Sequence, residues 1–222
     1  MRITETAAET AAETAAETTS PTVLQYGNLS MAYDYFNRTL FDGELAECMI
    51  VTEASTPRCL GHFCPESWQG ADGKSVCHEI NLSQRHLDRP LIAVFGTLVH
   101  EMAHLWQQDF GKPSKNGYHN KEWGGKMKQL GLHPSNTGEV GGKECGQSMT
   151  HYIVEGGAFS EACGGIPDDI TLPWVHAPRK LREKKPPTRI KYTCACGNAA
   201  WAKRECNLVC GDCSENMLGE ED

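Results

Sequence analysis

Apolar residues recur at helical spacing in two long segments of the chain. Residues 23–42 form the first, where one side of a helix carries Leu29, Ala32, Tyr33, Phe36 and Leu40. Asp42 and Gly43 follow with the residue types of a tight turn. Residues 91–108 form the second segment, which is apolar around most of its circumference and therefore predicts a buried helix. Gly111 suits the end of that helix.

Three shorter segments with strand character lie between the two helices. They span residues 48–54, 59–66 and 75–83, and a loop containing Gly70 and Gly73 joins the last two. This order predicts an α+β fold with an antiparallel sheet packed on the second helix. The third strand is the one we expect at a free edge, where an extended substrate can pair with it. A later amphipathic helix includes Met127 and Leu130.

Composition places the chain among globular proteins. Its 222 residues are 39% hydrophobic, which is enough for one moderate core and a small appendage. No apolar run approaches the roughly 18 residues of a membrane span, and the N-terminus lacks the order of a secretory signal. We therefore expect a soluble, cytoplasmic protein. A reducing compartment disfavours a disulfide framework, so the eleven cysteines point to metal binding instead.

The N-terminal residues 1–21 consist largely of a repeated Thr-Ala-Ala-Glu tetrad. Glutamates four residues apart repel one another along a helix face, and the repeat has almost no apolar side chain larger than alanine. We expect a solvated, mostly disordered tail, without an assigned function.

One stretch of the second helix carries candidate chemistry, His100-Glu101-Met102-Ala103-His104. Four residues make about one helical turn, so His100 and His104 project from the same face and can hold a single ion. Glu101 lies beside them, placed to act as a general base. Buried polar side chains need partners, and one zinc ion serves all three. The stretch therefore predicts a catalytic Zn²⁺ site rather than a polar helix face without metal.

Catalytic zinc commonly takes three protein ligands and leaves a fourth position open. His119, in the segment Tyr118-His119-Asn120-Lys121-Glu122-Trp123, is the best third ligand, a choice that rests on this ligand count together with the family resemblance given below. Glu122, His133 and His151 are the alternatives, and Glu122 is the strongest of them. A second group of metal-binding residue types lies in the strands, but it has no closely spaced ligand pair, so packing within the sheet is the better interpretation. It consists of Cys59, His62, Cys64, Cys77 and His78.

The C-terminal cysteines form two pairs, which are Cys194 with Cys196 and Cys210 with Cys213. Paired cysteines in a segment too short for its own core predict a structural Zn²⁺ site, here a zinc ribbon over residues 192–214. The first pair is spaced C-x-C where ribbons usually show C-x₂-C, so Cys206 remains an alternative ligand. We place the main domain at residues 22–175, a basic linker at 176–191 and an acidic tail at 215–222.

Positive charge gathers next to this ribbon although the whole chain has a net charge of −8. Residues 176–206 hold nine Lys and Arg against two Glu, and such a run binds phosphate backbones without sequence preference. Trp201 and Tyr192 are candidates for stacking on bases of single strands. A solvated linker is the other interpretation. The candidate nucleic-acid contacts are Arg179, Lys180, Arg182, Lys184, Lys185, Arg189, Lys191 and Trp201.

The sequence resembles the SprT-like family, the group that includes Spartan. The resemblance covers most of residues 29–213 and rests on FNRTLFDGEL (36–45), TLVHEMAHLWQ (97–107), YHNKEW (118–123) and the terminal cysteines. It implies a zincin-like metalloprotease fold with His100, His104 and His119 on zinc and Glu101 as general base. It also implies proteolysis of proteins bound or crosslinked to DNA.

The leading hypothesis is a zinc-dependent endopeptidase acting on DNA-associated proteins, located at the nucleoid if the protein is bacterial. One alternative is a non-proteolytic adaptor of DNA or transcription complexes, in which the histidine-bound zinc is structural. Glu101 argues against it, because a purely structural site needs no base. A peptidase without a nucleic-acid partner is the other alternative.

Overall fold

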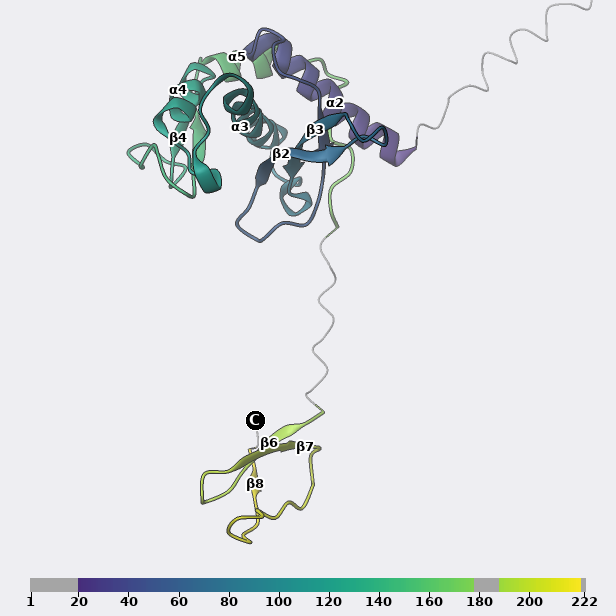
Figure 1. Cartoon of the computed structure of the whole chain (residues 1–222), viewed down its shortest axis with the longest axis vertical. Coiled ribbons are helices and arrows are strands. Elements are labelled where there is room, and N and C mark those ends of the chain that lie inside the picture. Colours follow the sequence, from purple (N-terminus) through teal and green to yellow (C-terminus); the bar gives the residue numbers. More distant parts are fainter. Residues whose placement is uncertain (1–19, 178–187, 221–222) are drawn as a thin grey trace, which may run out of the picture. The chain divides into compact units, whose positions relative to one another are not determined.

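The structure, a computed structural model, describes residues 20–177 and 188–220 (Figure 1). It divides into two compact units, an N-terminal unit of residues 1–177 and a C-terminal unit of residues 178–222. Outside the described residues lie 1–19 of the predicted tail, 221–222 of the predicted acidic segment, and the candidate contacts Arg179, Lys180, Arg182, Lys184 and Lys185. Among the described residues, no helix is both long and apolar enough to cross a membrane.

The first described helix, α2 (Pro21–Leu40), begins at a side-chain cap and ends at the predicted turn. Ser20 Oγ accepts a hydrogen bond from the Val23 N–H, and Pro21 suits the first helical position because its missing N–H would have no helical partner. Asp42 and Gly43 follow with φ of 58° and 73°, which stops the helix. The predicted apolar side is confirmed: Leu29, Ala32, Tyr33 and Phe36 are buried, and Leu40 is partly buried against the core.

The core forms where α2 meets the helices α3 (Leu91–Phe110) and α5 (Ala158–Gly164). The Phe36 ring centroid lies 5.5 Å from that of Phe95 on α3 and 5.7 Å from that of Phe159 on α5. α3 is buried along most of its length, as predicted, and ends at Gly111. His100 and Glu101 therefore lie on a helix that the core surrounds along most of its length.

The main sheet is mixed, so the prediction of an antiparallel sheet is wrong in one pairing. Its order is β1 (Cys48–Val51), β3 (Val76–Leu82), β2 (Gly61–Gln69). The turn at residues 70–75 makes β2 and β3 an antiparallel hairpin, whereas β1 joins the other side of β3 in parallel. The free edges therefore belong to β1 and β2, and the expectation that the third strand lies at an edge is also wrong. Apolar alternation defines the buried face of a strand but not its neighbours.

A bulge bends β2 between Cys64 and Trp68. Pro65 has no N–H for the strand ladder, and Glu66 follows with φ of 52°. The Glu66 N–H donates to His78 Nδ1 at 2.9 Å, and His78 Nε2 lies 3.3 Å from Asp109 Oδ1 at the end of α3. His78 thus fastens the bulge to the helix.

The elements that flank and follow α3 complete the N-terminal unit, and of these only the helix α4 (Lys121–Gln129) was predicted from the sequence. Two 3₁₀ turns, η1 (Gln84–His86) and η2 (Lys115–Gly117), flank α3, and α4 follows η2. β4 (Leu132–Ser135) and β5 (Thr150–Ile153) then form an antiparallel pair ahead of α5. β5 brings His151 back against α3.

The C-terminal unit is a three-stranded antiparallel sheet of order β7 (Ala199–Ala202), β6 (Ile190–Thr193), β8 (Leu218–Gly219). Its buried side chains among the described residues are Tyr192, Cys194 and Cys210. The Tyr192 hydroxyl donates to the Lys203 carbonyl at 2.8 Å and accepts from the Cys206 N–H at 3.0 Å. Tyr192 is therefore a core residue, and the expectation that it stacks on bases is wrong.

Candidate active site and metal centres

Three histidines meet at one face of α3. His100 and His104 lie one helical turn apart, and His119 arrives from the residue before the N-cap of α4. Metal-ligating nitrogens of the three rings lie within 4.8 Å of one another. The structure thus brings together the three residues that the sequence selected as the ligands of one ion.

The Trp123 ring packs against all three histidine rings. Its side chain is fully buried, and its ring centroid lies 4.8 Å from that of His100, 5.2 Å from His104 and 4.4 Å from His119. Asn120 caps α4 by accepting the Trp123 N–H at 3.0 Å. The start of α4 therefore fixes both His119 and the ring beneath all three ligands.

Two of the histidines have a partner for the ring nitrogen that faces away from the cluster. His119 Nδ1 lies 3.1 Å from the Gly146 carbonyl oxygen, which requires a proton on Nδ1. His100 Nδ1 lies 3.2 Å from His151 Nδ1. A protonated Nδ1 leaves the Nε2 lone pair of the same ring for a metal.

Burial sets the charge of the cluster. It lowers the pKa of His100 well below its usual value and that of His104 to about 3, and it also lowers the pKa of His119. The three imidazoles are therefore neutral at pH 7, the form that binds metal. Neutral, closely placed imidazoles on a rigid helix fit Zn²⁺, which accepts nitrogen ligands in tetrahedral geometry.

Glu101 is buried beside the cluster, and burial raises its pKa to about 8. A neighbouring divalent cation favours the charged carboxylate and would lower that pKa. Glu101 Oε1 faces Gly61, the first residue of β2. The carboxyl therefore lies between the metal helix and the edge strand.

A cleft with a volume of about 740 Å³ opens over these residues. It is lined by the start of β2, by the three histidines and Glu101, and by residues from the segments 113–119 and 147–151. β2 is an edge strand of the sheet. An extended peptide in this cleft can pair with that edge above the three histidines.

The rival third ligands are occupied elsewhere. Glu122 Oε2 accepts from Gln107 Nε2 and from the Lys112 N–H, both at 2.7 Å. His133 stacks on Tyr152 with 4.9 Å between ring centroids, and its Nε2 lies 3.4 Å from a Glu144 carboxylate oxygen. Neither joins the three-histidine group.

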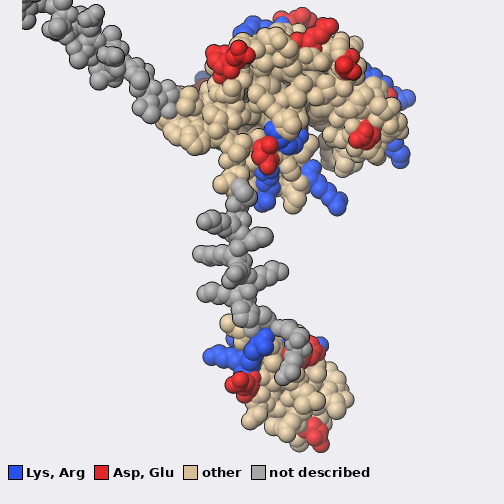
Figure 2. Space-filling model, turned by 180° about the vertical axis from the view of Figure 1, so that it is seen from behind, with Lys and Arg blue, Asp and Glu red and all other residues tan. Residues whose placement is uncertain are grey.

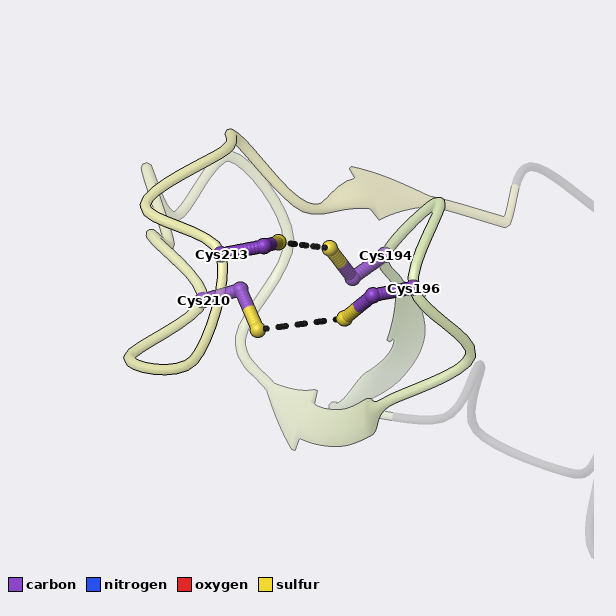
Figure 3. Close-up of side chains that lie close together, drawn as sticks. All are labelled: Cys194, Cys196, Cys210 and Cys213. Atoms are coloured by element: carbon purple, nitrogen blue, oxygen red, sulfur yellow. Dashed lines mark hydrogen bonds between the residues drawn. The ribbon is translucent and has the colours of Figure 1, made fainter.

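The second cluster consists of the four predicted cysteines. The side chains of Cys194, Cys196, Cys210 and Cys213 converge from two loops, as Figure 3 shows, and their sulfurs lie within 4.8 Å of one another. The Sγ atoms of Cys194 and Cys213 are 3.1 Å apart, and those of Cys196 and Cys210 are 3.5 Å apart. These distances exceed the roughly 2.05 Å of a disulfide.

The environment of this cluster suits a cation. Asn198 Nδ2 donates to Cys210 Sγ at 3.3 Å, and this hydrogen bond is the main reason that the Cys210 pKa falls to about 6. Thiolate sulfurs in this arrangement fit Zn²⁺. Cys206, the alternative ligand, is not among the four.

A third group, His62, Cys64 and Glu79, lies on adjacent strands with ligand atoms within 4.8 Å. Trp68 Nε1 donates to Glu79 Oε2 at 2.6 Å, so this carboxylate has a partner without an ion. Cys59 and Cys77 donate to nearby backbone carbonyls. These contacts agree with packing within the sheet.

The described candidate contacts with nucleic acid lie in the C-terminal unit. Trp201 on β7 is 63% exposed and lies opposite Lys191 on β6. Lys191 Nζ pairs with Glu220 at 3.1 Å, and Arg189 is exposed. The face of this unit seen in Figure 2 is mostly uncharged and carries both basic and acidic side chains, so it is not uniformly basic.

The roles of three residues at the site were not identified from the sequence. Gly146 contributes its backbone carbonyl, a group that every residue has, so its identity in the sequence does not indicate this role. His151 was visible as a histidine, but its approach to His100 depends on the pairing of β4 with β5. Gly61 likewise matters only because β2 starts against Glu101.

The N-terminal unit is an α+β domain whose helix α3 carries two members of a three-histidine group that can hold a metal ion. A model of the SprT-like family matches residues 29–145. This match spans more than half of the chain, so the protein belongs to the SprT-like family. Neither the curated proteins nor the solved structures contain a match to it.

Proposed function

We propose that the protein is a zinc-dependent endopeptidase that acts on proteins bound or crosslinked to DNA. The observation that carries the proposal is the placement of Glu101 and three neutral histidines in the lining of a cleft beside a free strand edge. A purely structural metal site has no need of a cleft or of a buried carboxyl beside it.

The chemistry follows from these side chains. Zinc held by His100, His104 and His119 supplies Lewis acidity, which polarises a carbonyl and makes a water molecule more acidic. Glu101 accepts the proton of the attacking water on its carboxylate and delivers it to the leaving amine. Trp123 and the cleft walls keep the ligands fixed, so the reacting groups meet in one geometry.

Substrate position follows from β2. Backbone pairing with an edge strand recognises an extended chain whatever its side chains are. This mode suits an enzyme that cuts many different proteins, and it requires a locally unfolded or flexible target segment.

The DNA part of the proposal rests on the C-terminal unit and the basic segment before it. Zinc held by Cys194, Cys196, Cys210 and Cys213 would stabilise a unit with few buried side chains. Exposed Trp201 offers a stacking surface for bases of single strands. Lys and Arg bind the backbone without sequence preference, and a DNA tether raises the local concentration of DNA-bound targets.

The test uses the full chain and a DNA-binding protein as substrate, with and without single- or double-stranded DNA. We expect DNA-stimulated cleavage by the wild type and its loss in Glu101→Gln. Glu155→Gln, an exposed glutamate outside the cleft, is the matched control and should cut normally. Unchanged cleavage in Glu101→Gln would refute the catalytic assignment.

The same experiment distinguishes the alternatives. A protein that binds about two zinc ions per chain but cuts nothing under any DNA condition is the non-proteolytic adaptor. Cleavage that is indifferent to DNA, together with absent DNA binding, identifies a peptidase without a nucleic-acid partner.

A further inference from the structure

His151 contacts the three-histidine cluster without belonging to it. It lies on β5, beyond the residues matched by the family model, and is held there by the pairing of β5 with β4. Its Nδ1 is 3.2 Å from Nδ1 of His100, and the two ring centroids are 5.4 Å apart. The side chain also lines the cleft.

We propose that His151 is a positioning residue for the metal ligand His100. Its Nδ1 accepts the Nδ1–H of His100 and thereby keeps the Nε2 lone pair of His100 directed at the other two histidines. This inference rests on the proposed function, since it assumes that His100 binds zinc.

The hydrogen bond has only one direction that is compatible with metal binding. Two Nδ1 atoms at 3.2 Å need one proton between them. If His151 donated it, neutral His100 would carry its own proton on Nε2 and could not be a ligand. If His100 donates it, Nε2 of His100 is free. The contact therefore selects the binding tautomer of His100.

His119, the other histidine whose Nδ1 has a hydrogen-bond partner, is oriented in the same way. His119 Nδ1 donates to the Gly146 carbonyl, and the His119 N–H donates to the same oxygen at 2.9 Å. Gly146 and His151 lie five residues apart, so one short segment orients two ligands. The Gly146 contact uses backbone, whereas the His151 contact depends on a side chain and can be changed by substitution.

Gly96 provides the space that His151 occupies. Gly96 precedes His100 by one helical turn on α3, and a Cβ there would lie 2.9 Å from His151 Nε2. Glycine inside a helix costs about 1 kcal/mol relative to alanine. A helix that accepts this cost at the position facing His151 indicates that the ring must stay close to α3.

The experiment compares two substitutions in the full-length protein. In His151→Asn the amide oxygen lies near the position of Nδ1 and remains an acceptor, whereas His151→Ala has none. The measurement is Co²⁺ affinity by chelator competition. Thiolate charge-transfer bands mark the four-cysteine cluster, so the three-histidine site is observed separately. We expect His151→Ala to weaken that site about 10- to 100-fold and His151→Asn to retain most of its affinity.

Gly96→Ala is the independent variant. It should weaken the site in the wild type by displacing His151, and should weaken it no further in His151→Ala. Equal losses in His151→Asn and His151→Ala, or wild-type affinity in His151→Ala, overturn the inference. Because metal affinity is measured without substrate, a wild type that binds the ion but cuts nothing refutes the proposed function alone.

Discussion

Gly61 and Glu101 lie against each other in the lining of the cleft: a Cβ on Gly61 would be 3.0 Å from Glu101 Oε1. The same Cβ would lie 2.9 Å from the Asn81 carbonyl oxygen and 3.0 Å from Thr97 Cγ2. A methyl group at this position would therefore be too close to atoms on three sides. Because Gly61 has no side chain, the Glu101 carboxyl can lie between β2 and α3.

Gly61→Ala should displace Glu101. We expect kcat/KM for a protein substrate to fall by about 10- to 100-fold, because small displacements of a reacting group cost that much, while zinc content stays at the wild-type level. The measurement is steady-state cleavage together with metal analysis. Neither Gly61 nor the control glycine, Gly27, has a positive φ, so backbone strain does not contribute.

Gly27→Ala is the matched control. Gly27 is exposed on α2, and a Cβ there meets nothing within 4 Å. This substitution should raise the free energy of unfolding by about 0.5–1 kcal/mol through helix propensity and leave cleavage unchanged. Equal activity of Gly61→Ala and Gly27→Ala would show that Glu101 tolerates the added methyl group.

Without metal, the N-terminal unit should be most stable near pH 7. Burial lowers the pKa of His104 to about 3 and that of His151 to about 4, and it lowers those of His100 and His119 as well. Below pH 6.5 the unfolded chain therefore binds more protons, and stability falls with acidification. Burial raises the pKa of Glu101 to about 8. From pH 4.5 to 8 the folded chain holds that proton, so stability also falls as pH rises.

At pH 6.5 the four histidines of the unfolded chain are still half protonated, which outweighs one buried carboxyl, so stability rises until the two effects balance near pH 7. Urea unfolding of the metal-free protein at a series of pH values measures the profile. Glu101→Gln should remove the decline from pH 7 to 8 and keep the decline in acid. A metal-free wild type whose stability does not fall between pH 7 and 8 would contradict the assignment of that decline to Glu101.

Metal removal should unfold the C-terminal unit and spare the N-terminal fold. Tyr192, Cys194 and Cys210 are the only hydrophobic residues buried in the described part of the C-terminal unit, whereas the N-terminal core joins three helices. Chelation followed by limited proteolysis should therefore release fragments from residues 188–220 first. Cys196→Ser should reproduce this sensitivity without a chelator, and Cys206→Ser should not, because Cys206 lies outside the cluster.

Trp201→Ala should weaken single-stranded DNA binding by about 1–3 kcal/mol, the usual contribution of one stacked base. Fluorescence anisotropy with a labelled oligonucleotide measures this loss at fixed salt. Trp174, 52% exposed in the N-terminal unit, provides the control Trp174→Ala, for which we expect wild-type affinity. Identical affinities for both variants would remove Trp201 from the DNA-binding surface.

The sequence pattern predicted those features that depend on residues close together in the chain. The faces of α2 and α3 followed from spacing, and the grouping of His100 with His104 followed from one helical turn. His119 required the family resemblance as well as ligand logic. The four cysteines followed from their spacing in a segment without its own core.

Relationships between distant segments could not be predicted in this way. The parallel pairing of β1 with β3 depends on which side of the hairpin β1 joins, and strand alternation carries no information on that choice. The contacts of Gly61 and Gly146 come from backbone and empty space rather than from side-chain chemistry. His151 needed the return of β5 to α3 before its role could be recognised.

The hydrogen bonds that orient His119 and His100 also bear on the order in which the site forms during synthesis of the chain. His119 is held by a carbonyl 27 residues later, and His100 by a ring 51 residues later. A growing polypeptide that has emerged only as far as His119 thus has all three ligands but lacks both groups that orient them. On this basis, the three-histidine centre reaches its final ligand orientation only after the segment 146–151 has been synthesised and has folded back against α3.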